Sequence, residues 1–299
     1  MNPRSVASPK NPAVPGRRPA HLRGLLVLPT AVWTGLFFFL PLALLLLYSF
    51  GQINVVTFQV TWGWNVENFS RIFDSLYLFP IGRSLLLSSA ATLMCLIAGF
   101  PVALWISRLR GWQQNLALLA VMIPFWSSFV VRTYALVNLL GDGGPLWNLS
   151  SALGISSNAP GILYSPEAIA IGILYTYLPL MILPLFVALE RIDPAVLEAA
   201  ADLGATGYRT FRRVILPMAA PGIIAGCILV GIPATGEYVI PAILGGGKTL
   251  MIGNVIADEF LKVGDYPFGS ALATTLMVVL TGILLIARSR LRRYEELAS

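Results

Sequence analysis

The run AIAIGILYTYLPLMILPLFVAL, Ala168–Leu189, contains no charged side chain. A helix needs about 20 mainly apolar residues to cross the hydrocarbon core of a bilayer, and this run has that length. A membrane-spanning β-strand would instead alternate apolar and polar residues over about ten positions. The run therefore predicts a transmembrane helix.

Five further runs have the same character. Only 11% of the 299 residues are charged, which is less than half of the share of about 25% found in soluble domains. A water-soluble globule is thereby excluded, and the predicted fold class is an all-α membrane protein, a bundle of six transmembrane helices. Besides Ala168–Leu189, the predicted helices are Leu25–Phe50, Leu85–Ser107, Leu116–Leu140, Ala219–Val239 and Phe268–Ala287.

Basic residues gather on one side of this predicted bundle. Fifteen of the 20 Lys and Arg residues lie before the first helix, in the loops after the second and fourth helices, and in the C-terminal tail. Cytoplasmic segments carry an excess of Lys and Arg, so both termini are predicted to be cytoplasmic. The net charge of +6 is therefore a topology signal, and we expect contact with membrane lipid and none with nucleic acid.

Composition divides the chain into four predicted segments. The only histidine, His21, falls in the N-terminal tail, and Cys95 and Cys227 fall in predicted helices, so we expect no metal site and no catalytic residue. The segments are a disordered basic tail (1–24), the first transmembrane helix with an outer loop (25–84), a core of five transmembrane helices (85–288) and a cytoplasmic tail (289–299).

The inner loop 191–218 has the signals of two short helices. Asp193-Pro194 is a helix cap followed by proline at the first helical position, and Gly204 stands where a helix ends. Thr206 is predicted to cap a second helix that Pro217 closes. Two short helices joined at a glycine, held at the membrane surface, form a docking element.

Two acidic residues lie on one face of the first of these helices. Glu198 and Asp202 are four positions apart, so they share a face and repel each other mildly. Such a pair suits a basic partner, but it also suits a solvated face near a helix N-terminus, where the helix dipole favours acids. Helical spacing alone favours neither interpretation.

The same loop carries a family resemblance. Glu198-Ala199-Ala200, followed by Gly204 and then Ile215-Leu216-Pro217, resembles the EAA loop of ABC-transporter importer permeases. In that family this loop is the coupling helix that sits in a groove of a cytoplasmic ATPase. The resemblance therefore implies an ATPase-docking surface that consists of Glu198, Ala199, Ala200, Asp202, Gly204 and Pro217.

Other strings resemble the polyamine (putrescine/spermidine) branch of the type I importers. They are Ile123–Ser128 (IPFWSS), Pro221–Gly226 (PGIIAG) and Gly236–Pro241 (GEYVIP) with Leu244–Gly246, although Ala242 stands where several relatives have an acid. The resemblance implies a multi-pass subunit of a bacterial inner membrane that is not itself an enzyme. Its implied partners are a second, similar permease, two copies of an ABC ATPase that binds ATP and Mg, and an extracytoplasmic substrate-binding protein.

One string imitates a nucleotide site. Gly246-Gly247-Lys248-Thr249 resembles the end of a P-loop, but Ala242 replaces the glycine required five positions before Gly247, and no strand precedes the string. The predicted topology also places it outside the cell. We therefore expect this chain to bind no nucleotide and no other cofactor.

Two charges interrupt the apolar runs. A charge at the bilayer centre costs about 2.5–3.5 kcal/mol on insertion scales, so Arg132 and Glu237 are expected to face a cavity or a partner. Glu237 lies between Pro233 and Pro241, which break the helix and free carbonyl groups beside the carboxylate. This combination suits an ammonium group, and the alternative is a structural Arg132–Glu237 ion pair.

A polyamine pathway would need further carboxylates and aromatic surface. Tyr238, Trp126 and Tyr134 offer faces for cation–π contact, although for each one alone packing or an interfacial aromatic belt is the better explanation. Asp258 and Glu259, with Asp265, would form an acidic approach on the outer side. The alternatives are the same fold importing an amino acid, thiamine, iron or an oxyanion, and a stand-alone secondary transporter, which would not explain the 191–218 loop.

Overall fold

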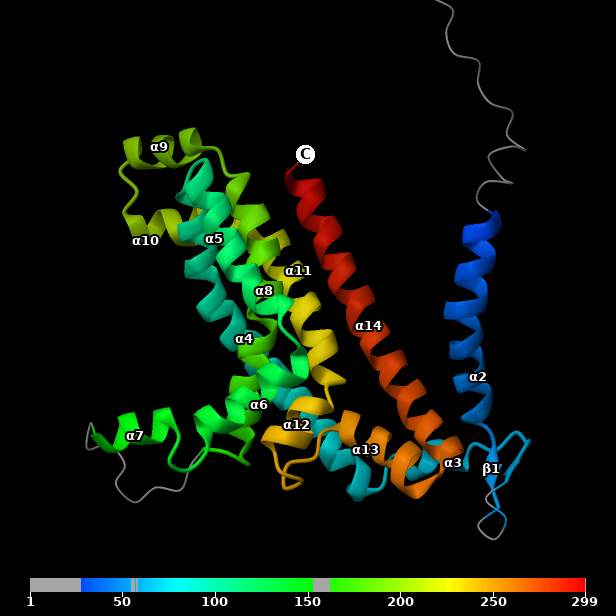
Figure 1. The fold of residues 1–299 in the computed structure, drawn as a ribbon. Coiled ribbons are helices and arrows are strands. Elements are labelled where there is room, and N and C mark those ends of the chain that lie inside the picture. Colours follow the sequence, from blue (N-terminus) through cyan, green and yellow to red (C-terminus); the bar gives the residue numbers. More distant parts are fainter. Residues whose placement is uncertain (1–27, 55–56, 58, 153–161, 299) are drawn as a thin grey trace, which may run out of the picture. The chain divides into compact units, whose positions relative to one another are not determined.

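A computed structural model describes residues 28–54, 57, 59–152 and 162–298, and the predicted tail 1–24 lies outside them. The chain divides into two compact units, Met1–Leu47 and Tyr48–Ser299. We describe each by itself (Figure 1).

The described part of the first unit is a single apolar helix. The helix is continuous over Leu28–Tyr48, so its last residue already belongs to the second unit, and it includes a π-helical turn, η1 (Gly35–Phe39), before α2 (Leu40–Tyr48). No residue between positions 28 and 47 is buried, and the rings of Trp33 and Phe37 stack on each other 4.3 Å apart. A helix that is apolar on every side suits a lipid environment or a partner helix.

Four long helices form the second unit: α4 (Ser75–Arg108), α8 (Pro166–Glu190), α11 (Leu216–Thr235) and α14 (Tyr266–Ala298). Gly222 and Gly226 let α11 approach α8 closely. A methyl group on Gly222 would lie 2.5 Å from the Cβ of Ala188 and 2.6 Å from the carbonyl oxygen of Pro184. Small residues therefore set this helix contact, as their spacing predicts.

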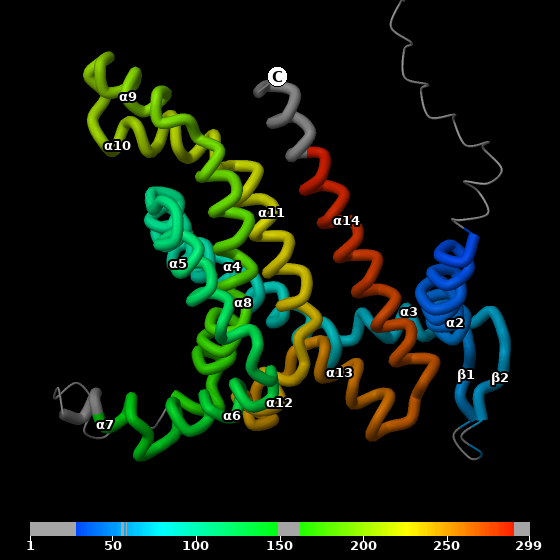
Figure 2. Tube along the Cα trace, turned by 45° about the horizontal axis from the view of Figure 1, so that its top comes forward, coloured from blue at the N-terminus to red at the C-terminus, as the bar shows by residue number. Residues whose placement is uncertain are grey.

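Several shorter elements lie at the two ends of this unit. In both views α9 and α10 lie at one end, and α12 and α13 lie at the other (Figures 1 and 2). The short elements are β1 (Gln52–Ile53), which pairs antiparallel with β2 (Val60–Thr61), α3 (Glu67–Arg71), α5 (Trp112–Met122), η2 (Ile123–Trp126), α6 (Phe129–Leu140), α7 (Pro145–Ala152), α9 (Pro194–Asp202), α10 (Gly207–Thr210), η3 (Phe211–Ile215), α12 (Val239–Leu244), α13 (Ile252–Asp258) and η4 (Glu259–Val263).

The predicted third transmembrane helix is not continuous. Trp112–Trp126 and Phe129–Asn148 meet at a bend of 91°. Pro124 lies in the 3₁₀ turn η2, and Ser127 leaves the helix in an extended conformation while its hydroxyl donates to the Pro124 carbonyl at 2.7 Å. Among the described residues, five helices are long and apolar enough to cross a membrane, or six if this bent pair is one span.

Candidate functional site

The 191–218 loop forms the two helices that its caps predict. The Asp193 carboxylate accepts a hydrogen bond from the Ala195 amide at 2.9 Å, which starts α9. At the other end Gly204 has φ +74°, and its amide donates to the Ala201 carbonyl at 2.8 Å. A left-handed residue at this point ends the helix, and glycine adopts that conformation without strain.

The second half of the loop differs from the prediction. Thr206 stands at the start of α10, but its side chain makes no capping bond. Pro217 does not close the helix, because α10 continues through the wide π turn η3 into α11 as one helix, Gly207–Thr235. Pro217 lies directly after this π turn, and the wider turn accommodates a proline, which has no amide to donate, inside the continuous helix.

The predicted docking residues are accessible on the chain. Glu198, Ala199, Asp202 and Gly204 are exposed on α9 and its end, and Ala200 is half-buried, whereas Pro217 is exposed at the start of α11. Leu197 packs against the apolar core on the opposite face. Leu203, which the sequence analysis missed, is 89% exposed beside these acids. Its only sequence signal is an apolar residue immediately before a helix-ending glycine.

The other site lies at the opposite end of the unit, where residues 236–238, the helix break, separate α11 from α12. Glu237 is 8% exposed there. Its Oε1 atom accepts bonds from the backbone amides of Tyr238 and Val239 at 3.1 and 3.0 Å, with a longer one at 3.5 Å from Ile240. Its Oε2 atom accepts the Tyr177 hydroxyl at 2.6 Å. The carboxylate therefore caps α12 and anchors it to α8.

Further contacts hold the helix break in place. The Asn254 side chain on α13 donates to the Tyr238 carbonyl at 2.8 Å. Gly253 packs so closely that a methyl group on it would lie 2.5 Å from the Gly236 carbonyl oxygen. Polar groups at this break are therefore bonded within the chain.

Arg132 has no such partners. It is 8% exposed on α6, and its Nε and Nη1 atoms are buried without a hydrogen-bond partner. Its guanidinium carbon lies 5.4 Å from the centre of the Phe125 ring. The alternative Arg132–Glu237 ion pair is absent, because the ion pairs among the described residues are Arg71–Asp265 and Lys262–Asp258.

The predicted aromatic stations are exposed on this chain. Trp126, at the end of η2, is 78% exposed, and Tyr134 on α6 and Tyr238 at the helix break are also more than half exposed. Packing within the chain therefore does not account for them. They remain available to substrate, lipid or another subunit.

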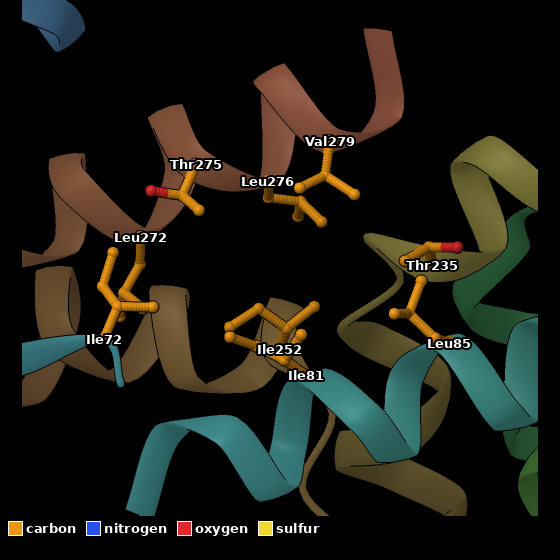
Figure 3. Close-up of a pocket in the computed structure, with 9 residues that line it drawn as sticks. All are labelled: Ile72, Ile81, Leu85, Thr235, Ile252, Leu272, Thr275, Leu276 and Val279. Carbon is orange, nitrogen blue, oxygen red and sulfur yellow. The ribbon is translucent and has the colours of Figure 1, made fainter. Parts of the chain in front are cut away.

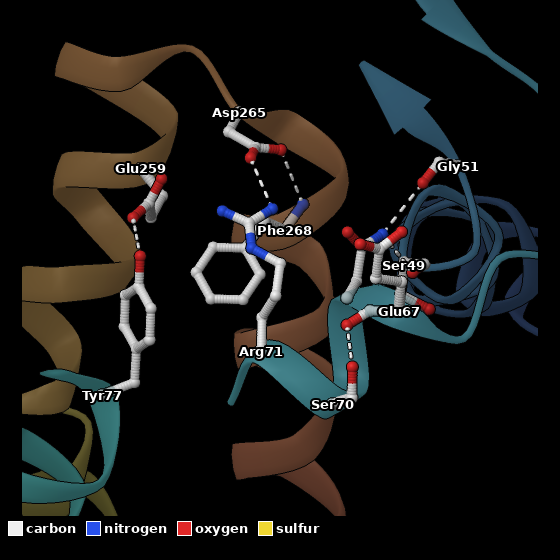
Figure 4. Close-up of polar contacts among 10 residues, drawn as sticks. Ser49, Gly51, Glu67, Ser70, Arg71, Tyr77, Glu259, Asp265 and Phe268 are labelled. Atoms are coloured by element: carbon white, nitrogen blue, oxygen red, sulfur yellow. Dashed lines mark hydrogen bonds and ion pairs between the residues drawn. The ribbon is translucent and has the colours of Figure 1, made fainter. Parts of the chain in front are cut away.

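The predicted acidic approach is internally paired, and Figure 4 shows the contacts of Glu259 and Asp265. Asp258 binds Lys262 at 2.7 Å, and Asp265 binds Arg71 at 3.0 Å. Glu259 is buried and accepts the Tyr77 hydroxyl at 3.5 Å. Burial, with a smaller contribution from the nearby Asp265 charge, raises the pKa of Glu259 above its usual range. These contacts fasten α3 and the start of α4 to η4 and α14.

Two hollows lie beside these helices. A cavity of about 30 Å³ is lined by Ile81 and Leu85 of α4, Ile252 of α13 and Leu276 of α14, with Thr235 on one side (Figure 3). It has room for about one water molecule, so it is not a substrate site. A more open groove of about 420 Å³ runs between α4, α11 and α14, and its polar lining is Ser88, Ser89, Thr92 and Thr235.

Comparisons with known proteins place this architecture. The family described as "Binding-protein-dependent transport system inner membrane component" matches residues 59–291. The spermidine/putrescine transport system permease protein PotB of Escherichia coli (strain K12) is 39% identical over 254 residues, which cover 85% of this chain and 92% of the relative. PotB of Haemophilus influenzae is 40% identical over 271 residues, covering 89% of this chain and 93% of the relative.

A solved structure shares the fold. The crystal structure of a bacterial ABC transporter involved in the import of the acidic polysaccharide alginate matches with a TM-score of 0.70 at 20% identity, covering 91% of this chain and 96% of that chain. Family match, relatives and fold agree with the multi-pass helical architecture. The chain therefore belongs to the family of binding-protein-dependent transport system inner membrane components.

Proposed function

We propose that this chain is a permease subunit of an ATP-driven importer and forms part of the membrane pathway for polyamines such as spermidine and putrescine. The observation that carries the proposal is the identity to the PotB relatives, which extends over nearly the whole length of both chains. That similarity favours a polyamine over an amino acid, thiamine, iron or an oxyanion. It also favours an ABC importer over a stand-alone secondary transporter.

Energy enters, in this proposal, through the 191–218 loop. In this loop the exposed side of α9 presents Glu198 and Asp202, with the apolar Leu203 beside them. An ATPase groove that supplies basic groups and an apolar pocket would bury this surface. The buried face of α9 packs on the core of α4 and α8 through Leu197, so movement of α9 is transmitted to the membrane helices. ATP and Mg are bound by the ATPase and not by this chain.

The pathway side of the proposal uses exposed aromatic faces. Trp126, Tyr134 and Tyr238 offer cation–π surface to ammonium groups, each contact contributing about 2 kcal/mol when desolvated. Glu237 attracts the cation by its charge. Direct contact with an ammonium group requires that the substrate replace the Tyr177 hydroxyl at Oε2. Arrival of substrate would then loosen the link between the helix break and α8.

The complete transporter tests this function. We expect a tag on this chain to co-purify a second permease, an ABC ATPase and, in the presence of polyamine, an extracytoplasmic binding protein. Proteoliposomes containing that complex are expected to take up labelled spermidine or putrescine only with internal ATP. Uptake of an oxyanion or amino acid in place of the polyamine would overturn the assigned substrate, and absence of any ATPase would overturn the assigned mechanism.

A further inference from the structure

A third hollow, the basic cavity, lies where α4, α8 and α9 meet. It has a volume of about 170 Å³, and its lining includes Ser107, Arg108, Arg110, Glu190, Pro194 and Leu197. Both α4 and α8 are long enough to cross a membrane and end here, at Arg108 and Glu190. The cavity therefore lies at the level of lipid headgroups.

Positive charge predominates in the basic cavity. Neither Arg108 nor Arg110 has an ion-pair partner within the part of the chain that the structure describes. The one carboxylate in the lining, Glu190, accepts a hydrogen bond from the Gln114 amide on α5 at 3.0 Å. The lining therefore holds two arginines and one carboxylate that is already hydrogen-bonded, so the cavity favours an anion.

The remaining walls are apolar. Leu104 and Leu189 line the side toward the helices, and Ile215 lines the side toward η3. A free inorganic anion would gain nothing from these walls, whereas an amphiphile would use both kinds of surface. Basic pockets between membrane helices at the cytoplasmic surface bind anionic lipid headgroups in this way.

We propose that the basic cavity binds the phosphodiester headgroup of an anionic phospholipid, with Arg108 and Arg110 as the phosphate-binding groups. One wall of the cavity is α9 itself, through Pro194 and Leu197. Bound lipid therefore supports α9 against the ends of α4 and α8. This second step rests on the proposed function, in which α9 docks the ATPase, whereas lipid binding does not depend on it.

Lipid retention tests the binding step. The complete transporter is purified in detergent from membranes that contain phosphatidylglycerol, and the lipid that remains bound is measured by mass spectrometry. An arginine beside an anionic headgroup contributes to the free energy of lipid binding, so we expect Arg108→Gln to reduce the retention of phosphatidylglycerol about fivefold. The Arg108→Gln/Arg110→Gln double variant should reduce it further.

Arg288→Gln is the matched control for lipid retention. Arg288 is an exposed arginine of α14 outside the cavity lining, so its variant should retain phosphatidylglycerol like the wild type. Equal retention in all variants would overturn the lipid site. Competition by millimolar inorganic phosphate would identify a site for free anions and would also overturn it.

Coupling tests the second step. Uptake per ATP hydrolysed is compared in vesicles of phosphatidylcholine alone and in vesicles that contain about one-quarter phosphatidylglycerol. The wild type and Arg288→Gln should couple better with the anionic lipid, and the double variant should respond to it much less. If the wild type retains lipid but the lipid has no effect on coupling, the claim that lipid supports α9 is contradicted, whereas the lipid-binding site stands. Absence of ATPase binding would contradict only the proposed function.

Discussion

The 191–218 loop and the helix break at residues 236–238 both interrupt long helices, at opposite ends of the second unit (Figure 1). At the loop, Glu198 and Asp202 are exposed. At the break, Glu237 is buried and accepts four hydrogen bonds from its own chain. One acidic region therefore leaves its carboxylates exposed, and the other uses its carboxylate to fix a backbone conformation.

This difference shows that an acid near a helix interruption has two physical roles. A carboxylate at a buried helix start gains from backbone amides and from the helix dipole. An exposed carboxylate pair on a short helix gains little within the chain, because water already solvates it. Burial and partners therefore separate the two roles, and residue type does not.

The largest effect concerns the side of the membrane on which each region lies. We predict that the 191–218 loop is cytoplasmic and that α13, next to the helix break, is outside. Reporter fusions at residues 112 and 205 should report inside, and fusions at 150 and 255 should report outside. If the reporters at 205 and 255 lie on the same side, the loop and the helix break face one compartment, and the predicted difference between them is contradicted.

The next effect concerns the stability of the folded protein. Glu237→Ala leaves the Tyr177 hydroxyl and the amides of α12 without an acceptor, so we expect a loss of about 2–4 kcal/mol in the free energy of unfolding. Thermal unfolding of the purified protein measures it. Glu198→Ala, on the exposed face of α9, is the control and should unfold like the wild type.

A milder pair of changes divides the role of Glu237 between structure and substrate. Tyr177→Phe removes one hydrogen bond and no charge, whereas Glu237→Gln removes the charge and keeps the size. If polyamine uptake falls with Glu237→Gln and not with Tyr177→Phe, the negative charge serves the substrate. Unchanged uptake in an intact Glu237→Gln complex would exclude Glu237 from the pathway.

Local signals predicted much of this architecture. The caps Asp193 and Gly204 were readable because a helix end depends on residues a few positions away. The apolar runs predicted the membrane helices for a similar reason, because the length and hydropathy of a run are enough to predict that it crosses a membrane. The third apolar run continues on both sides of Ser127, so its hydropathy did not predict the 91° bend. Pro124 lies next to the bend and was its one local signal.

Contacts between distant segments were not readable. Tyr177 lies 60 positions before Glu237, and nothing in either stretch predicts their 2.6 Å hydrogen bond. Arg71 and Asp265 are 194 positions apart, so the acidic approach looked open in the sequence. Pro217 was misjudged because the π turn before it, η3, accommodates a proline that an ordinary helix interior would not.

A smaller effect is predicted at the end of α9. Gly204→Asp forces a side chain into a left-handed conformation at φ +74°, which costs about 1–2 kcal/mol. Open space surrounds this position, so the variant should insert in the membrane normally. ATPase binding and uptake should fall together, as measured by co-purification and by transport.

Gly207→Ala is the matched control for that change. Gly207 is also exposed and has open space around it, but its φ is not left-handed. It should bind the ATPase like the wild type. Normal transport in Gly204→Asp with the ATPase still bound would contradict the docking role of the loop.

The smallest effect is a pH dependence of stability at the acidic approach. Its acids, like Glu237 at the helix break, are bonded to groups of the same chain. Burial raises the pKa of Glu259 in the folded protein, so the folded state binds this proton more tightly than the unfolded chain does. The contribution to stability is therefore fully present below the ordinary carboxyl pKa and is lost as pH rises through the raised value. Glu259→Gln removes that loss, so its thermal midpoint should vary less with pH across this window than that of the wild type.

Asp265→Asn is the contrasting variant, because it weakens the Arg71 ion pair and should lower the midpoint at neutral pH. A wild-type midpoint that rises through the window would show that Glu259 is ionised at no cost, and the outer acids would then resemble the exposed pair on α9.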